Sequence, residues 1–181
     1  MADSPSNKIG PGPWDKKNTL EEVTEDAFRT YKLGFDDLDV HVMYEKLPFE
    51  YDHNLKDAIS QLQAHSSFYD LKIDGEFLYL FPRQKELRSS FLDRTVSLDV
   101  SKMTIPDLIQ KIGDQVGVPM RFWAISNGSQ DAVITLKAKS ITVREVFDFI
   151  VLHDCTASWA VTHSHFYLPS DFIAKDVIVE F

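Results

Sequence analysis

The sequence predicts an α+β protein built from two small units, in which amphipathic helices cover short paired strands. Three observations support this class. A helix-start pattern recurs, in which a capping side chain precedes an acid by three residues, and apolar residues at helical spacing follow each start. Between the helices, segments alternate apolar and polar residues as strands do, and the Asp74-Gly75 pair marks a tight hairpin turn. The four starts are Thr19 with Glu22, Asn54 with Asp57, Thr104 with Asp107, and Thr142 with Glu145.

The first half of the chain is expected to hold a partial α+β unit over residues 19–83. Residues 1–18 are rich in Pro and Gly and are predicted to be flexible, with Trp14 either docking back or acting as a recognition aromatic. Residues 84–94 are polar and charged and are predicted to be a linker and a domain boundary. The elements expected in this unit are a helix from Thr19 ending at Gly34, a strand from Leu38 to Tyr44, a helix from Asn54 to His65, and a hairpin over residues 68–81.

The second half is expected to form a complete domain over residues 95–170, followed by a strand in residues 171–181. Pro106 suits the first turn of the helix that Thr104 caps, and Gly117 suits its end. The last strand has no partner downstream, so it either joins an edge of the domain or begins a truncated module. The predicted elements are strand 96–100, helix 104–116, strand 119–123, loop 126–130, strand 133–138, helix 142–153, a hairpin with strands 159–161 and 166–168, and strand 177–181.

The two halves share a pattern. Residues 54–80 align with residues 142–168 without a gap, so that Leu71 meets Trp159 and His65 meets His153. The repeated architecture is expected, whereas common ancestry of the two units is left open.

Residues 95–168 carry a family resemblance. The series VSLDV, TIPDLIQKIGDQVGV, MRFW, VITLKAK, ITVREVFDFIVL and SWAVTHSHFYL resembles the secretin and TonB short N-terminal domain, the N0-like module of secretins. Residues 38–82 look like the later half of the same module. The resemblance implies a βαββαββ fold that docks partner proteins in the bacterial cell envelope and has no catalytic residues. It also implies a periplasmic or outer-membrane location, if a signal peptide has been removed.

Surplus apolar residues indicate where a partner would bind. The helix from Thr142 has a complete core stripe without Phe149, Val151 and Leu152, so these three either meet internal cover or form a docking face. Strand edges are the second candidate surface, because an exposed edge can accept a strand from a partner. The edge residues proposed are Val133, Thr135 and Lys137 in one strand and Val177 and Val179 in another.

Composition and motifs argue against other functions. The net charge of −9 argues against nucleic acid as the main ligand, and the sequence contains no apolar run long enough to span a membrane. The single Cys155 cannot form an internal disulfide. His163 and His165 are only part of a metal site and fit turn polarity better, and His65 and His153 fit helix capping.

We therefore expect no catalytic residue, metal or cofactor in this chain. The expected partners are envelope proteins, and a homo-oligomer is also open. A ligand-sensing regulatory domain, similar to the C-terminal part of anti-sigma regulators, is the second reading. A small metal-dependent enzyme is the third.

Overall fold

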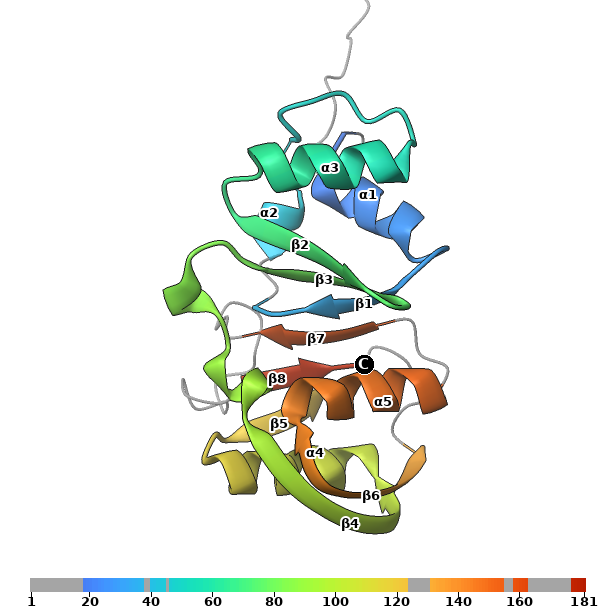
Figure 1. Cartoon of the computed structure of the whole chain (residues 1–181), viewed down its shortest axis with the longest axis vertical. Coiled ribbons are helices and arrows are strands. Elements are labelled where there is room, and N and C mark those ends of the chain that lie inside the picture. Colours follow the sequence, from blue (N-terminus) through green and yellow to red (C-terminus); the bar gives the residue numbers. More distant parts are fainter. Residues whose placement is uncertain (1–17, 38–39, 45, 124–130, 155–157, 163–176) are drawn as a thin grey trace, which may run out of the picture.

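The computed structural model describes residues 18–37, 40–44, 46–123, 131–154, 158–162 and 177–181. Five α-helices and two 3₁₀ turns alternate with eight strands in these residues (Figure 1). The helices are α1 Leu20–Ala27, α2 Val40–Met43, α3 Leu55–His65, α4 Ile105–Val116 and α5 Val143–Asp154, and the 3₁₀ turns are η1 Lys85–Leu87 and η2 Ser90–Asp93. The strands are β1 Lys32–Phe35, β2 Tyr69–Asp74, β3 Phe77–Pro82, β4 Thr95–Thr104, β5 Met120–Trp123, β6 Val133–Thr142, β7 Ser158–Thr162 and β8 Val177–Glu180. The fold is therefore α+β, as the sequence predicts.

One sheet runs through both halves of the chain. Its strand order is β2-β3-β1-β7-β8-β5, and β4 and β6 form a separate antiparallel pair. The halves join where β1 and β7 pair in parallel, with Gly34 opposite Trp159 (Figure 1). β8 lies between β7 and β5, so it is an interior strand of the sheet.

The helices pack on opposite faces of this sheet. One hydrophobic cluster joins α1 and α3 to Leu33, Leu78 and Leu80, and the other joins α4 and α5 to Tyr79 and Trp159. Alternate residues of β3 therefore enter different clusters, as expected of a strand with both faces covered. Figure 1 shows α1 and α3 toward the β2 end of the sheet and α4 and α5 toward the β5 end.

The two halves repeat one topology. The first half reads α1-β1-α3-β2-β3 with strands ordered β2-β3-β1, and the second reads α4-β5-α5-β7-β8 with strands ordered β7-β8-β5. In both, the last two strands pair antiparallel and the final strand pairs in parallel with the first. The β4–β6 ladder of the second half ends at Thr104, which pairs with Val133 at the start of α4. An isolated bridge between Thr19 and Lys46 stands at the matching place before α1.

The predicted helix starts are confirmed. Thr142 and Glu145 form a full capping box, because the Glu145 backbone N–H donates to Thr142 Oγ1 (3.2 Å) and the Thr142 backbone N–H donates to Glu145 Oε2 (2.8 Å). The Thr142 backbone N–H and the Thr142 hydroxyl both donate to the Glu145 carboxylate, and they hold the pKa of this carboxyl below its usual value. Thr104 accepts from the Asp107 backbone N–H, Pro106 lies in the first turn of α4, and Gly117 ends that helix with a φ of 68°.

Three expectations for the first half differ from the structure. The helix from Thr19 ends at Ala27, and Gly34 lies inside β1 instead of terminating a helix. The strand predicted over residues 38–44 is wrong where it is described, because Val40–Met43 form α2. Residues 84–94, predicted to be a linker, form η1 and η2 and place Phe91 and Leu92 in the core of the second half.

The end of the chain differs as well. The strand Trp159–Val161 is present within β7, but residues 163–168 of its predicted hairpin partner lie outside the described residues. The strand that pairs antiparallel with β7 is β8. The gapless alignment of residues 54–80 with 142–168 therefore fails at its last strand, because β8 occupies the place of β3.

Candidate functional site

The β4–β6 ribbon carries one group of predicted partner-binding residues. Among the described residues β6 pairs only with β4, so the other edge of β6 has no strand beside it. Val133, Thr135 and Lys137 point to the exposed side of β6, and Val133 is 54% exposed. Thr135 Oγ1 accepts from the Lys102 backbone N–H, and Lys137 forms an exposed ion pair with Asp99 at 2.7 Å. The side chains on this face of β6 are therefore accessible, and the described strands leave its outer edge unpaired.

The three surplus residues of α5 have different environments. Val151 is fully buried, so it belongs to the core and not to a docking face. Phe149 is half-buried against the same core, and its ring stacks on the His153 ring with the centroids 3.7 Å apart. Leu152 is 47% exposed. Contacts within the core therefore account for Val151 and for much of Phe149, and Leu152 is the accessible residue of the three.

Val177 and Val179 do not form an accessible edge. They are 4% and 0% exposed in β8, which has hydrogen-bonded strands on both sides. Strand addition at β8, predicted from its lack of a downstream partner, is therefore excluded in this fold. The sequence could not reveal that β5, 57 residues upstream, and the nearer β7 pair with the two edges of this strand.

A cavity with charged and apolar lining residues lies between the halves, and no pattern in the sequence indicates it. It has a volume of about 300 Å³ and is lined by residues of β2, of β3, of the 84–94 segment and of α5, together with Asp36. Five carboxylates and three cations are among these residues. The charged lining residues are Asp36, Lys72, Asp74, Arg88, Asp93, Arg144, Glu145 and Asp148.

Asp148, in the lining of this cavity, accepts two side-chain hydrogen bonds. Its Oδ1 accepts from Trp159 Nε1 and its Oδ2 accepts from the Tyr79 hydroxyl, each at 2.7 Å. Burial raises the pKa of the Asp148 carboxyl above its usual value, although both hydrogen bonds act in the opposite direction. Burial and the neighbouring carboxylate also raise the pKa of the Tyr79 phenol. Through these two bonds the Asp148 carboxyl joins α5 to β3 and β7.

Asp36 provides a second buried carboxylate in the same cavity. Its side chain is 1% exposed and accepts from the Ser89 backbone N–H, at 3.0 Å for Oδ1 and 3.3 Å for Oδ2. This contact fixes the 84–94 segment to the end of β1. Arg144 lies across the cavity, with its guanidinium 5.6 Å from the centre of the Tyr79 ring and 3.4 Å from Asp93 Oδ1.

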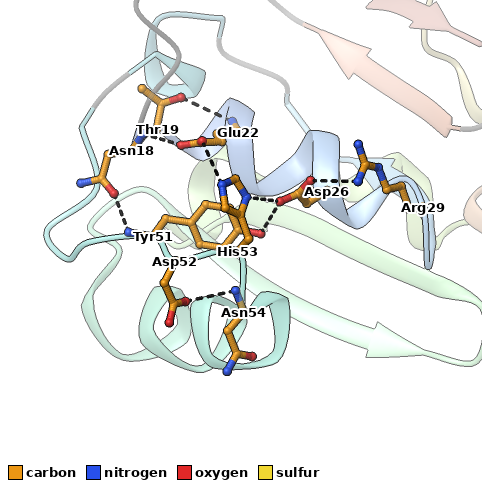
Figure 2. A network of polar contacts seen from close by, with 9 residues as sticks. All are labelled: Asn18, Thr19, Glu22, Asp26, Arg29, Tyr51, Asp52, His53 and Asn54. Carbon is orange, nitrogen blue, oxygen red and sulfur yellow. Dashed lines mark hydrogen bonds and ion pairs between the residues drawn. The ribbon is translucent and has the colours of Figure 1, made fainter.

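A second polar network holds the loop before α3 against α1 (Figure 2). Asp26 Oδ2 lies 2.8 Å from His53 Nδ1 and accepts from the Tyr51 hydroxyl at 2.8 Å. The bond to Asp26 raises the pKa of His53, and the bonds from His53 and Tyr51 lower the pKa of Asp26. Figure 2 shows Glu22 on the other side of the imidazole, 4.0 Å from Nε2. These contacts fix Tyr51 and His53 of the loop to Asp26 of α1, so they anchor the loop.

Two of the histidines singled out in the sequence lie at helix ends in the structure. His153 is the penultimate residue of α5, and its Nδ1 lies 3.0 Å from the Phe149 carbonyl oxygen, which agrees with the capping role predicted for it. His65 is the last residue of α3. His163, His165, Cys155 and Trp14 lie outside the described residues. Where the structure is described, no three His, Cys, Asp or Glu side chains are grouped as metal ligands require.

None of the described helices combines the length and the apolar character that crossing a membrane requires. Comparison of the chain with protein-family models, with curated proteins and with solved structures gives no match.

Proposed function

We propose that this chain is a non-enzymatic docking protein of the bacterial cell envelope, built on the short N-terminal secretin and TonB type of domain. The element order of residues 95–180 supports this reading, because β4-α4-β5-β6-α5-β7-β8 is the βαββαββ series that the resemblance implies. In this proposal the seven elements form one domain, and its strands divide between the β4–β6 pair and the β7-β8-β5 group.

The observation that carries the docking proposal is the open edge of β6. An unpaired strand edge offers backbone donors and acceptors in a row, and natural proteins protect such edges unless they are used. Lys139 gives the exposed side of β6 a basic group, and Val133 adds an apolar contact, while Lys137 is paired with Asp99. A partner would therefore present an extended segment with an acidic residue near Lys139 and an apolar residue near Val133.

Site-specific photocrosslinking in the native host tests this proposal. A photoreactive amino acid is placed at Val133 in one variant, at Leu152 in a second, and at the exposed Ser60 of α3 as a matched control. We expect a discrete adduct in the envelope fraction from position 133 and a weaker one or none from position 60. Equal adducts from all three positions, or none from position 133, would contradict docking at β6.

The cavity at Asp148 favours a second function, the ligand-sensing regulator. A space of about 300 Å³ with charged residues in its lining contacts both halves, so a small charged molecule bound there would change how the halves pack. Thermal unfolding in the presence of single charged metabolites tests this function. A rise in Tm that is lost in Arg144→Gln would favour it, whereas no rise with any of them would favour the docking reading.

A further inference from the structure

The joint between β1 and β7 is a docked interface between two modules of one topology. β1 ends the strand group β2-β3-β1 of the first half, and β7 begins the group β7-β8-β5 of the second. The strands pair in parallel, with Leu33 opposite Ser158, Gly34 opposite Trp159 and Phe35 opposite Ala160. The same module thus uses its β1-type edge to receive the β7-type edge of the next module.

Among the described strands, β2 and β5 stand at the two ends of the sheet, and each has one unpaired edge of the kind that forms the β1–β7 joint. β5 is the counterpart of β1 and β2 is the counterpart of β7, because each holds the same position in its strand group. The orientation of the backbone agrees. Lys32 N–H donates to Glu76 on the β3 side, so the alternate residue Leu33 faces β7. Val177 N–H donates to the Pro119 carbonyl, so by the same alternation Phe122 directs its backbone groups away from β8.

Both end strands carry exposed apolar side chains. Trp123 of β5 is 47% exposed and Ile73 of β2 is 44% exposed. Large apolar side chains at a sheet edge favour burial against another strand. In the topological correspondence Trp123 matches Gly34, and Leu71 matches Trp159. The tryptophan of the pair therefore lies on the β7 side of the internal joint, but on β5, the counterpart of β1, at the open end.

One residue distinguishes the open edge from the paired one. The Gln63 side-chain amide on α3 donates to the Leu71 carbonyl at 2.9 Å, which fills an acceptor on the outer edge of β2. The residue of α5 at the position of Gln63 is Val151, which is fully buried beside the paired β7. At the unpaired edge of β2, the Gln63 amide therefore bonds to a strand carbonyl. At the paired edge of β7, the matching residue is the apolar Val151.

We propose that a second copy of this chain docks its β2 edge in parallel on β5, repeating the β1–β7 joint with Trp123 beside Leu71 of the second copy. The Gln63 amide has to leave the Leu71 carbonyl for this contact to form, which keeps the association weak. The contact is head-to-tail, so it leaves one β5 edge and one β2 edge open and can extend to longer oligomers. It does not rest on the proposed function, because the β6 edge and Leu152 take no part in it.

Sedimentation velocity on the full chain, from about 10 μM to about 1 mM, measures this association. Gln63→Val copies the residue of the paired edge and should tighten self-association by about three- to tenfold, the effect of removing one competing hydrogen bond. Trp123→Lys should abolish self-association. Leu152→Lys places the same charge on an equally exposed side chain away from both edges and should leave it unchanged. Circular dichroism of each variant establishes that it is folded.

A mixing experiment separates a head-to-tail contact from a symmetric one. Trp123→Lys blocks β5, and Ile73→Lys blocks β2, so each variant alone should be monomeric. Their mixture should form a dimer from the intact β5 edge of one variant and the intact β2 edge of the other. This dimer should not grow further, because both of its remaining edges carry the lysine substitution. A single sedimenting monomer for both the unmodified chain and Gln63→Val at every concentration would overturn the proposal. Self-association that survives Trp123→Lys would overturn it too.

Discussion

Replacing Gly34 with alanine tests the packing of the joint most sharply. A Cβ at this position would lie 2.7 Å from Cζ2 of Trp159 and 2.7 Å from Cδ1 of Tyr79, closer than carbon atoms approach. Trp159 is fully buried and Tyr79 nearly so, and Asp148 holds both rings by hydrogen bonds. Neither ring can move aside without losing its bond to Asp148.

The expected loss of unfolding free energy follows from these contacts. Overpacking a filled core costs about 1–3 kcal/mol, and breaking a buried hydrogen bond adds about 1–3 kcal/mol. Alanine inside a strand is otherwise favoured over glycine by about 0.5–1 kcal/mol. We therefore expect Gly34→Ala to lose about 2–4 kcal/mol. Because strand propensity alone would increase stability, a loss isolates the steric clash.

Urea unfolding followed by circular dichroism measures this loss, with the m-value expected to stay the same. The Trp159→Phe background supplies the control, since phenylalanine lacks the indole atoms that the new Cβ would meet. The cost of Gly34→Ala should fall by about 1 kcal/mol or more there. A cost below about 0.5 kcal/mol in the unmodified background would refute the packing of Trp159 over β1.

Three further predictions concern single side chains. Asp148→Ala leaves two ring donors without an acceptor and should cost about 2–4 kcal/mol in urea unfolding, whereas Asp148→Asn, which can still pair with both, should cost less than half of that. The stability that His53 adds should be fully present below about pH 6.5 and be lost as pH rises through its raised native pKa, and Asp26→Asn should return the pKa of His53 in an NMR titration toward 6.5. Val151→Ala should cost about 2–3 kcal/mol in thermal or urea unfolding and Leu152→Ala less than about 0.5 kcal/mol; equal costs would contradict their assignment to core and surface.

Local signals in the sequence predict the helix starts and the first hairpin well. Thr104 and Asp107 lie three residues apart, so the bonds they form depend on the backbone within one turn and on nothing distant. The Asp74-Gly75 turn is local in the same way, and the strands on its two sides pair as expected. These features are fixed by chain geometry over a few residues.

Contacts between distant segments account for the expectations that fail. Gly34 is read as a helix stop because glycine ends helices, but Trp159, 125 positions away, requires the absence of a side chain in β1. β8 is read as an edge because no strand follows it, yet it pairs with β5 and β7. The polar 84–94 segment resembles a linker until Phe91 and Leu92 reach the core.

The candidate surfaces also differ in whether local sequence or contacts between distant segments determine them. The exposed side of β6 follows from alternation along one strand, and Val133, Thr135 and Lys137 lie on it. The cavity at Asp148 needs three segments that are distant in the sequence, so no local pattern could indicate it. A buried carboxylate that pairs with Tyr79 and Trp159 is visible only after β3, β7 and α5 have come together.

The measurement that tests the continuous sheet most directly is the set of interstrand NMR contacts between β1 and β7. The structure predicts backbone NOEs that link Leu33, Gly34 and Phe35 with Ser158, Trp159 and Ala160 in parallel register. NOEs from β7 to β8 but none from β7 to β1 would show two separate sheets. That result would contradict the shared joint and, with it, the proposed head-to-tail association.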